Sequence, residues 1–121
     1  MPYSITFEVH TMPLTLNEVM GKHWRARHTN FEKVKSEIGA RLTGLKPKTP
    51  LKSISVKILR MSSGTLDPDN LYFTCKPVLD ALVREGVMID DGFENIKKLS
   101  PTQVKIKRGM PKKLIVSVEE V

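Results

Sequence analysis

The sequence LDPDNLYFTCKPVLDALVREGVMIDD, residues 66–91, carries the strongest structural signals in this chain. It begins with a proline-stiffened loop and continues into a helix expected from about Asn70 to Glu85, which Gly86 would cap at its C-terminal end. A short apolar run, residues 87–89, then ends at two consecutive aspartates. The sequence therefore predicts a loop, a helix and a segment that returns along it.

Segments of alternating polarity surround this stretch and predict strands. Tyr3 to Val9 alternates apolar with polar residues, and Ile54 to Ile58 does the same. Two more strands are expected at Leu99 to Lys107 and at Lys113 to Val118, and a glycine-containing turn would join them.

A first helix is expected between the first two strands. Thr29 and Glu32 show the spacing of a capping box, which marks a helix N-terminus. The following apolar residues would share one face of that helix: Phe31, Val34, Ile38 and Leu42. The resulting order, β-α-β-α-β-β, predicts a single α+β domain over residues 1–121, with helices packed on a mixed sheet.

The charge of the chain is unevenly distributed. Its formal net charge is +7, yet the segment from Asp67 to Glu94 holds seven acidic and two basic residues and is net −5. The remaining residues include eighteen basic and six acidic side chains, a net of +12. Excess positive charge favours a polyanionic partner such as nucleic acid, because each neutralised phosphate releases counterions.

Several classes of protein are disfavoured by the sequence. Residues 1–10 lack the basic leader and apolar run of a signal peptide, and no stretch approaches the roughly 18 apolar residues of a membrane span. The single cysteine, Cys75, excludes an internal disulfide and a cysteine-based zinc site. The sequence also lacks a glycine-rich phosphate-binding loop, so this motif gives no indication of an organic cofactor. We therefore expect a cytoplasmic protein that uses neither a membrane nor an organic cofactor.

Asp67 and Asp69 lie two residues apart in the sequence DPDN. In an extended segment both side chains would point to the same side, and Pro68 would stiffen that spacing. Two neighbouring carboxylates repel each other unless a cation lies between them, and oxygen ligands of this kind suit Mg²⁺ or Mn²⁺. The alternative is that Asp69 or Asn70 caps the helix while Asp67 is solvated.

Asp91 is the candidate third ligand of such a metal, and Asp90 is an additional candidate acid. A tight turn at Gly86 would bring Asp91 back along the helix towards the first acidic pair. Three converging carboxylates in a basic protein are typical of metal-dependent nucleases. The alternative is that Asp90 and Asp91, which precede a glycine, only mark a turn.

Lys76 is a candidate for stabilising charge at the reacting phosphate or for protonating the leaving group. It lies seven residues after Asp69, so a helix would place both on about the same face. The alternative is an exposed lysine that pairs with Asp80, four residues further on.

The pattern D-x-D-N-L, then K-x-x-L-D-A-L, then D-D, resembles the RusA family of crossover-junction endodeoxyribonucleases, which occurs in bacteria and prophages. The resemblance implies that the family's metal-site acids correspond to Asp67, Asp69 and Asp91, and its lysine to Lys76. One departure concerns spacing. The family usually has its lysine four residues after the second aspartate, and here residues 72–74 add almost one helical turn.

The resemblance also implies a substrate and an assembly. It implies a homodimer that binds four-way (Holliday) DNA junctions and, with Mg²⁺ or Mn²⁺, nicks two strands of like polarity. A dimer is physically reasonable because symmetric incision needs two sites related by a two-fold axis. Such a protein would be associated with the nucleoid through its DNA.

Two basic clusters could contact DNA. The candidate DNA-binding residues are Lys22, Arg25, Arg27, Lys105, Lys107 and Arg108. Trp24 lies within the first cluster and would contact a base unless it belongs to the core. The second cluster would line one strand and the following turn, or would form a solvated hairpin whose lysines discourage edge pairing.

Together these features predict a metal-dependent endonuclease of branched DNA. One alternative is a protein of the same fold that binds branched DNA without cutting it. The other is a small basic binding domain whose acidic residues serve only as caps and turns. These hypotheses differ in one geometric requirement, because only the enzyme needs Asp67, Asp69 and Asp91 to converge.

Overall fold

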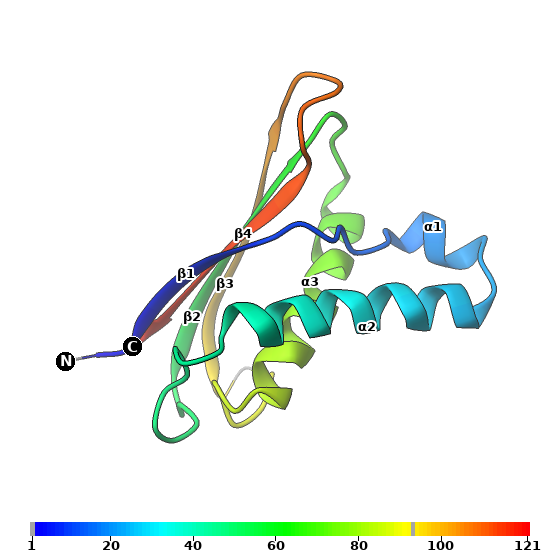
Figure 1. The fold of residues 1–121 in the computed structure, drawn as a ribbon. Helices are drawn as coiled ribbons and strands as arrows, with labels where there is room; N and C mark the ends of the chain where they lie inside the picture. The colour runs from blue at the N-terminus through cyan, green and yellow to red at the C-terminus, as the bar shows by residue number, and fades with distance from the viewer. Residues whose placement is uncertain (1, 93) are drawn as a thin grey trace.

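The computed structural model describes residues 2–92 and 94–121, which fold around one mixed sheet of four strands (Figure 1). The strands are β1 (Ser4–Val9), β2 (Ile54–Ser62), β3 (Ile96–Lys105) and β4 (Lys113–Glu120). Their order across the sheet is β1-β4-β2-β3. β4 is antiparallel to both β1 and β2, whereas β3 is parallel to β2.

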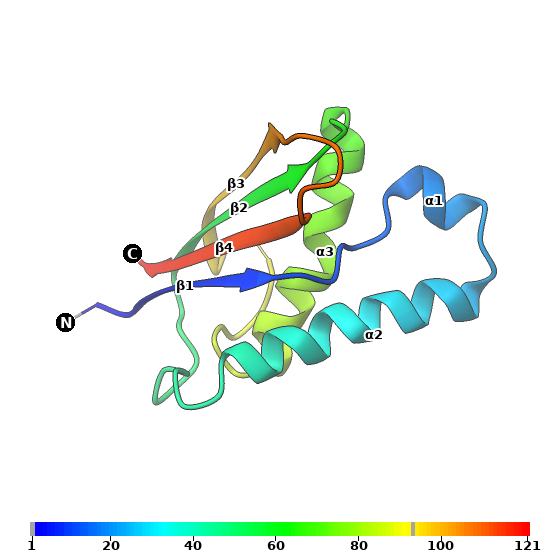
Figure 2. The ribbon, with the colours of Figure 1, turned by 45° about the horizontal axis from the view of Figure 1, so that its top comes forward.

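Three helices accompany the sheet: α1 (Leu16–Met20), α2 (Trp24–Arg41) and α3 (Pro68–Arg84). α2 and α3 cover the same face of the sheet, and α3 provides the crossover between the parallel strands β2 and β3 (Figure 2). The predicted α+β class with a mixed sheet is confirmed. The element order differs from the expected one by the short helix α1. Within residues 2–92 and 94–121, the helices are too short or too polar to cross a membrane.

The core lies between the sheet and the two long helices. Alternate residues of β1, β2 and β4 point towards the helices, which explains the period-two apolar pattern of these segments. Fully buried side chains come from β1, β2, β4, α2 and α3, and they include Val9, Val34, Ile38, Ile54, Val56, Val78, Leu82, Val116 and Val118.

The N-terminal boundary of α2 differs from the prediction. The helix begins at Trp24, and the ring Nδ1 of His23 accepts a hydrogen bond of 3.2 Å from the backbone N–H of Arg25. Thr29 therefore lies inside the helix. The capping box forms instead at the first of two T-x-x-E sequences, where Thr15 and Glu18 exchange hydrogen bonds at the start of α1. The spacing alone does not distinguish the two sequences.

The predicted connection between the last two strands is also wrong in one respect. The turn after β3 is present, with the N–H of Met110 bonded to the carbonyl of Lys107 and Gly109 at φ 93°. However, β2 lies between β3 and β4, so these strands do not form a hairpin. β3 is instead an edge strand. Its lysines fit the role of discouraging edge pairing without the hairpin.

Candidate functional site

The first acidic pair lies at the N-terminus of α3, where Asp67 is the capping residue. Its backbone is extended, with φ −69° and ψ 166°, and its Oδ1 accepts a hydrogen bond of 2.9 Å from the backbone N–H of Asn70. Pro68 occupies the first helical position, where the missing N–H costs nothing. Capping therefore falls to Asp67, whereas the sequence suggested Asp69 or Asn70 for that role.

Asp69 directly follows Pro68 in the first turn of α3, and it is exposed. A carboxylate in the first helical turn interacts favourably with the partial positive charge of the helix N-terminus. Asp69 is therefore stable where it lies, and its carboxylate faces solvent rather than serving as the cap.

Asn70 has a role in this motif that its sequence did not predict. It is buried, with 6% of its surface exposed, and its side-chain amide donates to Asp67 Oδ1 at 3.1 Å. Its Oδ1 accepts a hydrogen bond of 3.3 Å from the backbone N–H of Asn17 in α1. One buried amide thus joins α1 to the capping carboxylate. The contact spans 53 positions, and no local pattern signals it.

The loop before Asp67 is also held from a distance. The backbone N–H and carbonyl of Leu66 both bond to the side-chain amide of Gln103 in β3, each at 2.8 Å. This pair of bonds fixes the segment that leads into the acidic pair. Lys105 lies two residues after Gln103 and is in register with Ser62, the last residue of β2. A basic side chain therefore lies at the end of the sheet from which Asp67 follows.

Asp91 returns to α3 as the sequence suggested. Gly86 adopts φ 77°, and Met88 then forms a parallel bridge with Leu51. The chain continues to Asp91, whose Oδ2 lies 3.1 Å from the Nζ of Lys76. Asp90 contributes by accepting a hydrogen bond of 2.8 Å at Oδ1 from the backbone N–H of Asp91.

Lys76 contacts a second carboxylate as well, because Asp80 Oδ1 lies 3.3 Å from its Nζ. The pairing with Asp80 and the convergence with Asp91 were predicted as alternatives, and the structure contains both. The hydrogen bonds to Asp91 and then to Asp80 raise the pKa of Lys76. The hydrogen bond from Lys76 lowers the pKa of Asp91. Both groups are therefore charged at neutral pH. We call Asp69, Lys76 and Asp80, together with the docked Asp91, the α3 face.

Cys75 is next to Lys76 but belongs to the core. Only 1% of its surface is exposed, and burial raises the pKa of its thiol to about 11. A buried, protonated thiol is a poor nucleophile and a poor metal ligand. Cys75 is therefore no part of the candidate chemistry.

The three predicted metal ligands do not form one set in this arrangement. Lys76, which holds Asp91, lies roughly 10 Å along the helix axis from Asp69, at 1.5 Å per residue. Oδ1 of Asp67 is engaged in capping, and Oδ2 of Asp91 is engaged by Lys76. Among the residues described, no group of three or more His, Cys, Asp or Glu side chains is placed to hold an ion. The magnesium site stays a prediction that this geometry does not support.

The first basic cluster is exposed, as DNA contact requires. Lys22, Arg25 and Arg27 all face solvent, at the corner between α1 and α2. Trp24 is 56% exposed, so it does not belong to the core. In the second cluster, Lys105, Lys107 and Arg108 are exposed as well.

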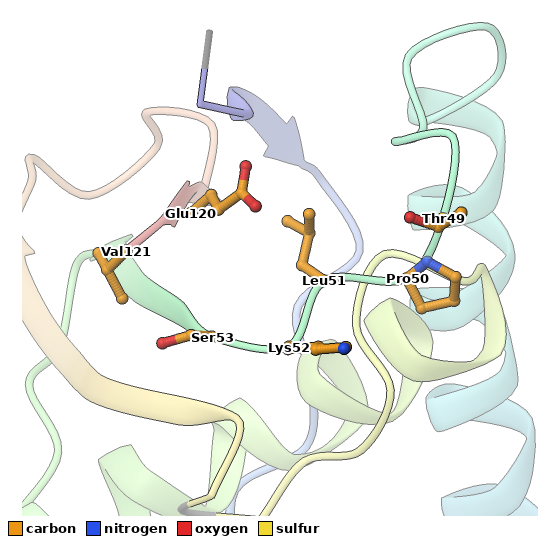
Figure 3. A pocket seen from close by; sticks show the side chains of 7 residues that line it. All are labelled: Thr49, Pro50, Leu51, Lys52, Ser53, Glu120 and Val121. Atoms are coloured by element: carbon orange, nitrogen blue, oxygen red, sulfur yellow. The ribbon is translucent and has the colours of Figure 1, made fainter.

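A hollow in the surface lies apart from the α3 face (Figure 3). It is lined by Thr49, Pro50, Leu51, Lys52, Ser53, Glu120 and Val121. These residues gather at the end of the sheet where β2 begins, whereas Asp67 follows the other end of β2. No candidate site residue lines this hollow.

No family model matches the chain, and a search of curated proteins found no match.

The two aspartates at the start of α3 can be separated by their effect on stability. We expect Asp67→Ala to lower the free energy of unfolding by about 1 kcal/mol, because it removes an N-cap. Asp69→Ala should cost only about 0.3–1 kcal/mol, the value of a charge near a helix N-terminus. Urea denaturation of both variants measures the difference. A smaller loss for Asp67→Ala than for Asp69→Ala would show that Asp67 is not the cap.

Proposed function

We propose that this chain is a metal-dependent endonuclease that cuts branched DNA, with the four-way junction as its expected substrate. A homodimer would be its working form, as the resemblance to the RusA family implies. The supporting observation is that folding returns Asp91 to Lys76, on the α3 face that also carries Asp69. A structural turn alone would not need to place Asp91 against that helix.

The charges around the α3 face support a polyanionic substrate. The face itself is acidic and would repel phosphates, so cleavage there should depend on a divalent cation from solution. Basic groups are linked to the N-terminal end of this face. Lys105 is at the end of the sheet next to Asp67, and α1, which leads to the first basic cluster, is bonded to Asn70.

A second candidate function is the binding of branched DNA without cleavage. It is favoured by the position of the Lys76 amine, which lies between Asp80 and Asp91 at 3.3 and 3.1 Å. A lysine neutralised by two carboxylates is less free to approach a phosphate. The longer spacing between Asp69 and Lys76 points in the same direction.

Chelation and metal addition would distinguish the two functions. Protein treated with EDTA should bind a labelled four-way junction without cutting it, and adding Mg²⁺ or Mn²⁺ should produce nicks. A linear duplex of the same sequence is the control and should remain intact. Tight binding without nicks at any metal concentration would favour the second candidate. Cleavage that persists in EDTA would contradict metal dependence.

A further inference from the structure

Residues 20–29, here called the tip, project from the body of the molecule. α1 and the first turns of α2 extend beyond the edge of the sheet (Figures 1 and 2). All ten residues of the tip are exposed, and α2 first buries a side chain at Val34. A helix segment without buried contacts gains no stability from packing, which suggests that a partner contacts it.

The tip is uniformly basic. No acidic residue lies between Glu18 and Glu32, while Lys22, Arg25 and Arg27 fall in that interval. None of these three cations forms an ion pair with any residue that the structure describes. They are therefore available to an external anion. The same charge disfavours contact between the tips of two copies of the chain.

Trp24 presents its ring at the surface of the tip. The Arg25 guanidinium lies 5.5 Å from the ring centroid, and the His23 ring lies 5.6 Å away at an interplanar angle of 34°. Exposed aromatic rings next to arginines are typical of surfaces on which nucleic-acid bases stack.

The base of the tip is connected to the acidic pair. α1 precedes the tip directly, and the N–H of Asn17 in α1 bonds to Asn70, whose amide contacts Asp67. The start of the tip is therefore fixed relative to the N-terminus of α3.

We propose that the tip binds DNA at unpaired or splayed bases, with the Trp24 ring stacked on a base and Lys22, Arg25 and Arg27 on the flanking phosphates. Stacking requires an accessible base face, which a branch point or a single strand offers and a continuous duplex does not. The inference rests on the proposed function for its branched substrate, but it does not require cleavage.

Tryptophan fluorescence tests the inference directly, because Trp24 is the single tryptophan of the chain. In EDTA, a four-way junction and a 20-nucleotide single strand should quench its emission, and a linear duplex should quench it much less. Trp24→Ala should weaken binding to the junction and single strand about tenfold, the loss of one stacked base. Its effect on duplex binding should be less than about twofold.

Two variants of the tip serve as controls. Trp24→Phe keeps an aromatic face and should retain most of the affinity, whereas Met20→Ala removes an exposed apolar side chain without a ring and should change little. Junction binding with unchanged fluorescence, or with full affinity in Trp24→Ala, would overturn the inference and leave the proposed function standing. Quenching without cleavage in any metal would support the inference and contradict the enzyme.

Sedimentation analysis of the protein without DNA tests whether the tip contacts a second copy of the chain instead of DNA. The inference predicts the same oligomeric state for wild type and Trp24→Ala. Dissociation of an oligomer in the variant would show that the tip contacts a second copy instead. A wild-type chain that binds none of the three DNAs would overturn both proposals.

Discussion

Asp69→Asn is expected to reduce the rate of junction cleavage about 100-fold or more while leaving junction binding intact. The proposed function requires Asp69 to be a metal ligand. Removing an outer-shell partner of a metal site typically lowers metal affinity or activity about 10–100-fold, and removing a charged ligand should lower the activity at least as much. The substitution keeps the size of the side chain. Asp69 is exposed and does not cap α3, so the fold should be retained. Single-turnover cleavage with Mg²⁺ measures the effect.

Glu119→Gln provides the matched control for this variant. Glu119 is an exposed carboxylate in β4, paired in register with Ser4 and Ser55 on the sheet and remote from α3 in sequence. The Glu119→Gln substitution removes the same unit of negative charge as Asp69→Asn, so any general effect of net charge on DNA affinity appears in both variants. A cleavage rate for Asp69→Asn within about twofold of the control would remove Asp69 from the catalytic site.

Ile38→Ala is expected to have the largest effect on stability, about 2–5 kcal/mol. Ile38 is fully buried and is one of two residues, with Val34, that α2 buries within its bounds. Truncation would leave a cavity between α2 and the sheet, and the exposed N-terminal half of α2 could not compensate. Urea denaturation, followed by circular dichroism, measures the loss.

Ser36→Ala is the control for that variant, because Ser36 is exposed on the same helix. Exposed substitutions of this kind usually change stability by less than about 0.5 kcal/mol. A loss below about 1 kcal/mol for Ile38→Ala would mean that α2 is not anchored to the sheet as the structure shows. The position of the tip relative to the sheet would then no longer be supported, because the tip includes the N-terminal part of α2.

Local patterns in the sequence were sufficient for most elements of the fold. β1, β2 and β4 alternate polarity because one sheet face packs on the helices. Most of α3 could be read from its apolar positions, and Gly86 marked its end. These features depend on residues within a few positions of one another, which is why they were predictable.

Contacts between distant segments were not predictable from local patterns. The order of the strands places β2 between β3 and β4, although the turn between those two suggested a hairpin. The T-x-x-E spacing occurs at Thr15 and at Thr29, and tertiary context selects the first. The bond between Asn17 and Asn70 has no sequence signal, because its partners lie 53 positions apart.

The candidate site was predicted in part. The return of Asp91 to α3 was expected from the turn at Gly86, and the structure places it against Lys76. The same turn was expected to bring Asp91 together with Asp67 and Asp69, and the residues that the structure describes do not show this convergence. The spacing of two helical turns between Asp69 and Lys76 accounts for that separation.

Mapping the nicks in a four-way junction tests the central proposal most directly. Each strand would be labelled in turn and the junction incubated with the protein and Mg²⁺. We expect two nicks at symmetric positions in strands of like polarity, and no cleavage of the linear duplex. Unpaired nicks that occur equally in junction and duplex, or a junction that is bound and left intact, would contradict it.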